Sequence, residues 1–239
     1  MHDRDVVPAA QSPRLQVRGG GRFPVRRIYC VGRNFDDHAR EMGAPVAASK
    51  AERGTPVFFH KPADAVVVDG RIPYPPGTAD LHHEVELVVA IGRDAPPGEL
   101  AVEDAAGLVF GYGIGLDLTR RDLQAAAKAR GLPWDSAKGF DASAPVSELV
   151  AADDAGALGP RLLSLEVNGE RRQQSRLDAM VWDVAEILHE LSKLYALRAG
   201  DLVFMGTPAG VAALQPGDAC VARLDGLLEL HCQVHAPVA

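Results

Sequence analysis

The stretch D-L-H-H-E-V-E-L-V-V-A, residues 80–90, decides the fold class. In a β-strand, successive side chains point to opposite faces, so Glu84 and Glu86 share one face. Val85 and Leu87 point the other way, which indicates a strand packed against an apolar core. Burying two unpaired carboxylates on such a strand would cost a large amount of free energy. The stretch therefore predicts a β-rich core that carries an acidic site.

A second strand, L-V-F-G-Y-G-I-G-L-D (108–117), follows the same pattern. Its apolar side chains alternate with Gly111, Gly113 and Gly115, and Asp117 ends the run on the glycine face. Glycine weakens a strand interior, so three glycines on one face indicate the close approach of backbone, side chain or ligand.

Glu84, Glu86 and Asp117 together offer only carboxylate oxygens. Hard oxygen donors suit Mg²⁺, Mn²⁺ or Ca²⁺ better than zinc. Two alternatives stay open, a solvated acidic face and a zinc site that uses His82 or His83. Neighbouring strand residues face opposite ways, so at most one of these histidines could join the glutamates.

A short helix is expected after the strand 26–31, with Asn34 as its N-cap and Gly43 at its C-terminus. His38 and Glu41 are three residues apart and therefore share one helix face. A carboxylate that orients an imidazole makes a suitable general base, although an exposed ion pair has the same spacing.

Composition favours one α+β domain, with a loose arm over 1–22 and a catalytic domain over 23–239. The 239 residues are 47% hydrophobic and 24% charged, and 24 glycines and 17 prolines indicate many turns. The expected helices cover 119–130, capped by Thr119, and about 181–195. Asp69-Gly70 and Asn168-Gly169 predict hairpins.

The formal net charge of −7, without a basic cluster, argues against nucleic acid as a partner. No uncharged stretch is long enough to cross a membrane, and no secretory signal is apparent. The three cysteines are Cys30, Cys220 and Cys232, an odd number without metal-site spacing, so we expect reduced core thiols and a cytoplasmic protein.

Seven segments, taken in order, resemble the fumarylacetoacetate hydrolase family. They are Y-C-V-G-R-N-F-D-D-H-A-R-E-M-G (29–43), F-F-H-K-P (58–62), D-L-H-H-E-V-E-L-V-V-A (80–90), G-L-D-L-T-R-R-D-L-Q (115–124), G-L-P-W-D-S-A-K-G-F (131–140), V-N-G-E (167–170) and G-D-L-V-F-M-G-T-P-A-G-V (200–211). The resemblance implies a mixed β-sheet roll with short peripheral helices, commonly assembled as a homodimer.

The resemblance also assigns roles to individual residues. It implies that the carboxylate trio binds Mg²⁺ or Mn²⁺, that His38 and Glu41 activate water on a segment that closes over substrate, and that Lys138 lies near the metal. The implied substrate-contacting residues are Arg33, Asn34, Lys61, Gln124 and Thr207.

The implied activity is metal-dependent hydrolysis of a carbon–carbon bond in a 2,4-diketo acid. Fumarylpyruvate, an intermediate of gentisate and aromatic compound degradation, is the expected substrate, giving fumarate and pyruvate. General acylpyruvate hydrolysis, oxaloacetate decarboxylation and keto-acid isomerisation are alternatives on the same site. A non-catalytic ligand-binding β-domain with a structural Ca²⁺ is an alternative of a different class.

Overall fold

The computed structural model describes residues 5–8 and 11–237. The strands are β1 (Arg14–Gln16), β2 (Arg22–Pro24), β3 (Arg27–Gly32), β4 (Val57–Lys61), β5 (Val66–Val67), β6 (Arg71–Pro73), β7 (Leu81–His83), β8 (Val85–Ile91), β9 (Val109–Leu116), β10 (Thr119–Arg120), β11 (Ala144–Pro145), β12 (Val150–Ala151), β13 (Leu162–Val167), β14 (Glu170–Arg176), β15 (Asp201–Phe204), β16 (Ala212–Leu214), β17 (Ala219–Leu224) and β18 (Leu228–His235). The α-helices are α1 (Asp36–Glu41), α2 (Arg121–Ala129), α3 (Asp135–Lys138), α4 (Ala152–Ala155) and α5 (Val184–Ser192), and the 3₁₀-helices are η1 (Lys50–Glu52), η2 (Ala63–Ala65), η3 (Val102–Leu108) and η4 (Leu177–Ala179).

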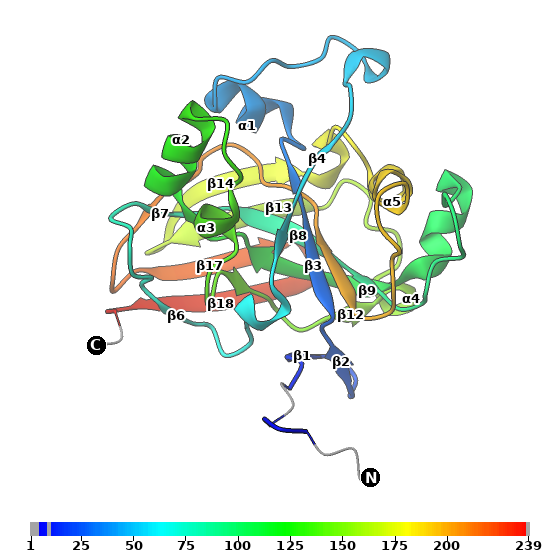
Figure 1. Ribbon diagram of the computed structural model, residues 1–239, viewed down its shortest axis with the longest axis horizontal. Helices are drawn as coiled ribbons and strands as arrows, with labels where there is room; N and C mark the ends of the chain where they lie inside the picture. Colours follow the sequence, from blue (N-terminus) through cyan, green and yellow to red (C-terminus); the bar gives the residue numbers. More distant parts are fainter. Residues whose placement is uncertain (1–4, 9–10, 238–239) are drawn as a thin grey trace.

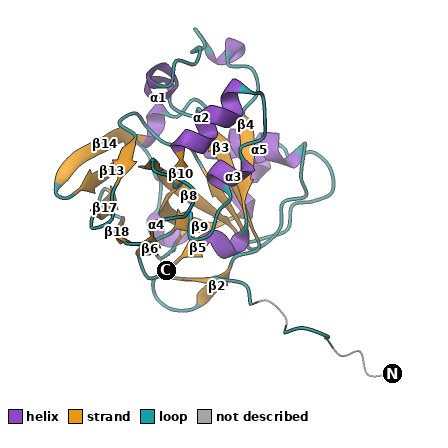
Figure 2. Ribbon diagram, turned by 60° about the vertical axis from the view of Figure 1, so that its left-hand side comes forward, coloured by secondary structure: helices purple, strands orange, loops and turns teal. Residues whose placement is uncertain are grey.

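Two large mixed sheets form the body of the molecule. One has the strand order β12-β9-β8-β15-β3-β4 and the other has the order β14-β13-β17-β18-β6. The helices are short, and α1, α2 and α3 gather at one end of the β-core (Figures 1 and 2). The expected α+β architecture, a mixed β-sheet roll with short peripheral helices, is confirmed.

The two faces of β8 lie in different surroundings. Val85 and Leu87 belong to the larger apolar cluster, which also includes Leu165 of β13. Val88 belongs to a second cluster together with Phe204. The strand is buried on both faces, as the sequence predicts. The acidic site lies on the second face.

The glycine face of β9 is covered closely by the segment 144–151. A Cβ atom placed on Gly111 would lie 2.2 Å from the carbonyl oxygen of Val150, and one placed on Gly115 would lie 2.9 Å from the carbonyl oxygen of Pro145. Gly115 is the register partner of Glu86, so the segment also closes one side of the acidic site.

We expect Gly111→Ala to lower the free energy of unfolding by about 2 kcal/mol or more, because the added methyl group overpacks against backbone. Gly107→Ala is the matched control, since nothing lies within 4 Å of its added Cβ. Denaturant unfolding of the two variants measures the difference. Equal stability of both would contradict the close contact between β9 and the Val150 carbonyl.

Three local expectations are wrong. The arm 1–22 is not loose throughout, because β1 pairs with β2 and Leu15 is buried in the second apolar cluster. Asp69-Gly70 does not close a hairpin, since β5 pairs with β11 and β6 pairs with β18. Thr119 lies in β10 and does not cap α2, which starts two residues later.

Two other expectations, the turn at Asn168-Gly169 and the buried free cysteines, are confirmed. Asn168-Gly169 links the antiparallel strands β13 and β14, and both residues have positive φ. All three cysteines are free and buried. Within the described part of the chain, no helix has the length and apolar character needed to cross a membrane.

Candidate active site

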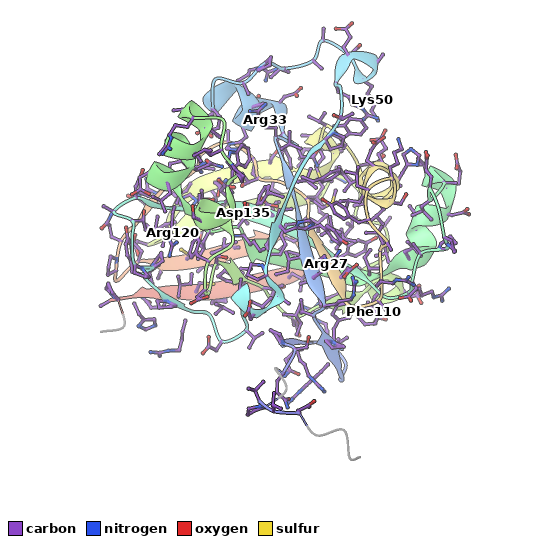
Figure 3. The ribbon with its side chains drawn as sticks, in the orientation of Figure 1. Arg27, Arg33, Lys50, Phe110, Arg120 and Asp135 are labelled. Atoms are coloured by element: carbon purple, nitrogen blue, oxygen red, sulfur yellow. The ribbon has the colours of Figure 1, made fainter. Side chains whose placement is uncertain are left out.

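A cavity opens beneath α1 and α2 at the helical end of the molecule. Its lining joins all three predicted metal ligands to a set of polar and cationic side chains: Arg33, His38, Glu84, Glu86, Asp117, Arg121, Gln124, Lys128, Trp134, Lys138 and Thr207. Figure 3 labels Arg33 beneath α1, Arg120 of β10 and Asp135 at the start of α3.

The three carboxylates converge because their strands are neighbours. Glu84 immediately precedes β8, Glu86 lies within β8, and Asp117 immediately follows β9. The Asp117 backbone N–H donates to the Glu84 carbonyl at 2.8 Å, which fixes the two strand ends together. One oxygen from each carboxylate lies within 4.8 Å of the others, and all three residues are buried.

Lysine and arginine side chains compensate two of these carboxylates. Lys138 Nζ lies 2.8 Å from Glu84 Oε2 and 2.6 Å from Asp117 Oδ2, and Arg121 also pairs with Glu84. Burial alone would raise the pKa of Glu84, but the charges of Lys138 and Arg121 hold it well below its ordinary value. The same carboxylates raise the pKa of Lys138 against the effect of burial.

Glu86 is the carboxylate left without a cation among the described residues. The Gly206 N–H donates to its Oε2 at 2.6 Å. Burial, followed by the charges of Asp117 and Glu84, raises the pKa of Glu86 well above its ordinary value. Ionised Glu86 therefore needs a further positive charge, and three hard oxygen donors at this spacing fit a divalent cation of the Mg²⁺ or Mn²⁺ type.

His38 and Glu41 form the predicted pair. His38 Nδ1 lies 3.1 Å from Glu41 Oε2, and the Gly210 N–H donates to Glu41 Oε1 at 3.0 Å. The hydrogen-bond network therefore assigns Nδ1–H as the donor to Glu41, which leaves Nε2 as an acceptor. His38 lines the cavity, so a proton acceptor is held beside the acidic cluster.

Thr207 lies in the cavity wall on a loop that a neighbouring glutamine fixes. Gln173 of β14 donates from Nε2 to Thr207 Oγ1 and to the Pro208 carbonyl, both at 2.8 Å. Its Oε1 accepts from the Val85 backbone N–H at 3.0 Å. Gln173 is the single buried residue of β14, and its strand gives no periodic signal that marks it in the sequence.

Two of the residues predicted to contact substrate lie outside the cavity. Lys61 is buried behind Asp117, with Nζ 2.9 Å from Asp117 Oδ1 and donating to the Leu118 carbonyl. Asn34 neither caps α1 nor reaches the cavity, since its side chain donates to the Trp182 and Met205 carbonyls and accepts from the Trp182 N–H. Neither side chain lines the cavity.

Arg33 and Gln124 do line the cavity, and their contact with substrate stays a prediction. Arg33 adopts a φ of 60°, an uncommon conformation for a residue with a side chain, and it directly follows β3. No motif in the sequence marks Arg121, Lys128 or Trp134 as part of the site. Arg121 and Gln124 are three residues apart on α2, a spacing that puts both on one helix face.

The segment between α1 and β4 is fastened to α5. Arg53 donates to Glu186 at 2.7 and 3.0 Å and its guanidinium lies 3.5 Å from the centre of the Trp182 ring. Glu186 also completes a capping box with Asp183 at the start of α5. The hydrogen bonds from Arg53 lower the pKa of Glu186 from 4.5 to about 2.

We expect Glu186→Gln to reduce stability at pH 7 and to have little effect near pH 2. A depressed pKa gives stability that is present above pH 4.5 and is lost as the pH falls through 2. The linkage corresponds to about 3 kcal/mol, which solvent screening of this partly exposed pair reduces to about 1–2 kcal/mol. Glutamine preserves the capping box. Urea unfolding of both proteins between pH 2 and 7 measures the effect, and a pH-independent difference would contradict it.

A family model described as Fumarylacetoacetate (FAA) hydrolase C-terminal matches residues 27–235. The chain belongs to the fumarylacetoacetate hydrolase family. A fumarylpyruvate hydrolase of Ralstonia sp. is 40% identical over 195 residues, which cover 81% of this chain and 98% of the relative. An oxaloacetate tautomerase of Escherichia coli is 41% identical over 207 residues, which cover 85% of this chain and 90% of that protein.

A solved structure of this fumarylacetoacetate hydrolase family shares the fold along nearly its whole length. It is the fumarylpyruvate hydrolase from Pseudomonas aeruginosa in complex with Mn²⁺ and pyruvate, with a TM-score of 0.91 and 43% identity, covering 98% of this chain and 100% of that one. The family therefore includes hydrolases and tautomerases of small keto acids at similar distance from this chain.

Proposed function

We propose that this protein hydrolyses the C3–C4 bond of fumarylpyruvate and releases fumarate and pyruvate. The observation that carries the proposal is the oriented His38–Glu41 pair on the wall of the cavity that holds the three carboxylates. The hydrolase relatives from Ralstonia and Pseudomonas support the choice of substrate.

Glu84, Glu86 and Asp117 would hold the divalent cation. The cation would supply Lewis acidity toward the oxygens of the 2-keto acid end of the substrate. Mg²⁺ and Mn²⁺ fit the oxygen donors equally, and Ca²⁺ is a further candidate.

His38 performs the proton transfer in the proposed reaction. Its Nε2 takes a proton from water while Glu41 holds the Nδ1–H and stabilises the imidazolium that forms. The water oxygen bonds to C4 of the substrate, and the C3–C4 bond then breaks with its electron pair on C3. His38 then gives this proton to C3. One water and one diketo acid are thereby converted to fumarate and pyruvate, with no atoms left over.

Lys138 stabilises negative charge in this reaction. Its ammonium group donates to Glu84, Asp117 and Thr119, so all three N–H bonds are occupied. Its raised pKa also makes it a poor proton donor. These two features support an electrostatic role over protonation of the departing carbon.

The test is pyruvate release from fumarylpyruvate, measured with a coupled dehydrogenase in the presence of Mg²⁺, Mn²⁺ or EDTA. We expect turnover with either cation and a loss of turnover in EDTA. Absence of pyruvate release at saturating cation would overturn the proposal. The expectations of a homodimer and of a cytoplasmic location remain predictions, which light scattering and fractionation test.

Oxaloacetate is the second candidate substrate, because the tautomerase relative matches this chain with 41% identity. Keto–enol exchange or decarboxylation of oxaloacetate needs no water attack at a C4 ketone. Assays of oxaloacetate beside fumarylpyruvate therefore distinguish the candidates. Turnover of oxaloacetate alone would move the enzyme from the hydrolases to the isomerases or lyases.

A further inference from the structure

The cavity-facing side of α2 carries three polar residues in a row. Arg121, Gln124 and Lys128 lie at positions i, i+3 and i+7, and all three line the cavity. At 1.5 Å per residue, Lys128 lies about 10 Å along the helix axis from Arg121. That span is comparable with the length of a seven-carbon diacid.

The two ends of this row are used differently. Arg121 pairs with Glu84 and donates to Gln124, so its charge is already compensated by the acidic cluster. The Lys128 ammonium group makes no ion pair or hydrogen bond with the described residues, and its Nζ lies 5.2 Å from the centre of the Trp134 ring. Burial, followed by the positive charges of Arg121 and Arg33, lowers the pKa of Lys128.

Arg33 adds a second cation without a carboxylate partner in the described chain, and it lines the same cavity. Lys138, Arg121 and Lys61 are each paired with Glu84 or Asp117. Among the described residues, Lys128 and Arg33 are the cations of the cavity lining that have no such partner. Arg33 and Lys128 are both solvent-exposed at the cavity that they line. Two uncompensated cations that line one cavity favour an anionic group between them.

We propose that Lys128, with Arg33 beside it, binds the distal carboxylate of a dicarboxylic 2-keto acid and thereby selects diacids over acids with an uncharged acyl end. The inference rests on the proposed function for the identity of the substrate. Trp134 positions Lys128 through the contact of its ring with the ammonium group. The row on α2 then runs from the acidic cluster to the far end of the substrate.

The test uses two ligands of equal carbon number, 2-oxoheptanedioate and 2-oxoheptanoate, which differ in the distal carboxylate. Calorimetric titration of the Mg²⁺-loaded protein gives a dissociation constant for each. We expect the diacid to bind about tenfold more tightly, because its distal carboxylate would accept charge-assisted hydrogen bonds from two cations. Lys128→Met should remove most of this preference, and Lys128→Arg should keep it.

Arg130→Met is the matched control, because it removes one positive charge from the same end of α2 at a residue outside the cavity lining. It should leave the preference for the diacid unchanged. A wild-type protein that binds both acids equally would overturn the inference, as would an equal loss of preference in Arg130→Met.

Kinetics separate this inference from the proposed function. We expect Lys128→Met to raise KM for fumarylpyruvate more than it lowers kcat, and to lower the ratio of kcat/KM for fumarylpyruvate over acetylpyruvate about tenfold. A Lys128-dependent preference for the diacid in binding, without hydrolysis of either diketo acid, would support the inference and contradict the proposed function. Hydrolysis of fumarylpyruvate and acetylpyruvate by Lys128→Met with an unchanged ratio of kcat/KM would support the proposed function and contradict the inference.

Discussion

Replacement of His38 with alanine is expected to lower kcat for fumarylpyruvate by about 10²–10⁴-fold, the usual contribution of a general base. The imidazole lines the cavity, and its Nδ1 is fixed by Glu41, so its removal takes away the positioned proton acceptor. Affinity for the divalent cation should not change, because the carboxylate ligands remain. Steady-state pyruvate release and cation titration measure the two quantities.

Glu41→Gln is a milder variant that tests the same assignment of the base. Glutamine keeps an oxygen for the Nδ1–H of His38 and for the Gly210 N–H, but it removes the charge that stabilises the imidazolium. We expect a smaller loss, about tenfold. Near-native hydrolysis by His38→Ala would refute the assignment of the base. Loss of oxaloacetate turnover to the same extent would refute a base role specific to hydrolysis.

The second large effect is expected at Glu86, where Glu86→Gln should abolish turnover and yet stabilise the cation-free protein. Burial and the nearby Asp117 and Glu84 raise the pKa of Glu86, so its ionised form destabilises the fold. A raised acid pKa gives stability that is present at low pH and is lost as the pH rises. In EDTA at pH 8, the variant should therefore melt several degrees above wild type.

Addition of Mg²⁺ or Mn²⁺ should reverse that order. Binding to the folded state stabilises the wild type by mass action, whereas the variant, with one ligand removed, should respond weakly. Thermal unfolding of wild type and variant in EDTA and in excess cation, at pH 5 and pH 8, measures these differences. A wild type that is insensitive to cations, or a variant that is less stable than wild type in EDTA, would contradict the metal-site assignment.

The sequence predicts the parts of the site that depend on strand or helix periodicity. The alternation around Glu84 and Glu86 places both carboxylates correctly, and the spacing of His38 and Glu41 predicts a hydrogen bond that the structure confirms. The glycines of β9 likewise indicate the close cover that the segment 144–151 provides. Local geometry decides each of these features.

The errors concern residues whose surroundings come from distant parts of the chain. Asn34 has the chemistry of an N-cap, but tertiary contacts with Trp182 and Met205 take up its amide. Asp69-Gly70 has the composition of a hairpin turn, yet its flanking strands pair with β11 and β18. Gln173 supports the site from across the molecule, and no spacing rule reveals such a contact.

The acidic cluster and the base differ in how the fold holds them. The carboxylates lie within or directly beside the adjacent strands β8 and β9, whereas His38 lies on a six-residue helix that contacts the Thr207 loop through Glu41 and Gly210. A substitution on α1 can therefore remove the proton acceptor without disturbing the buried carboxylates. The proposed hydrolysis is thus expected to be lost by single changes that leave the candidate cation site intact.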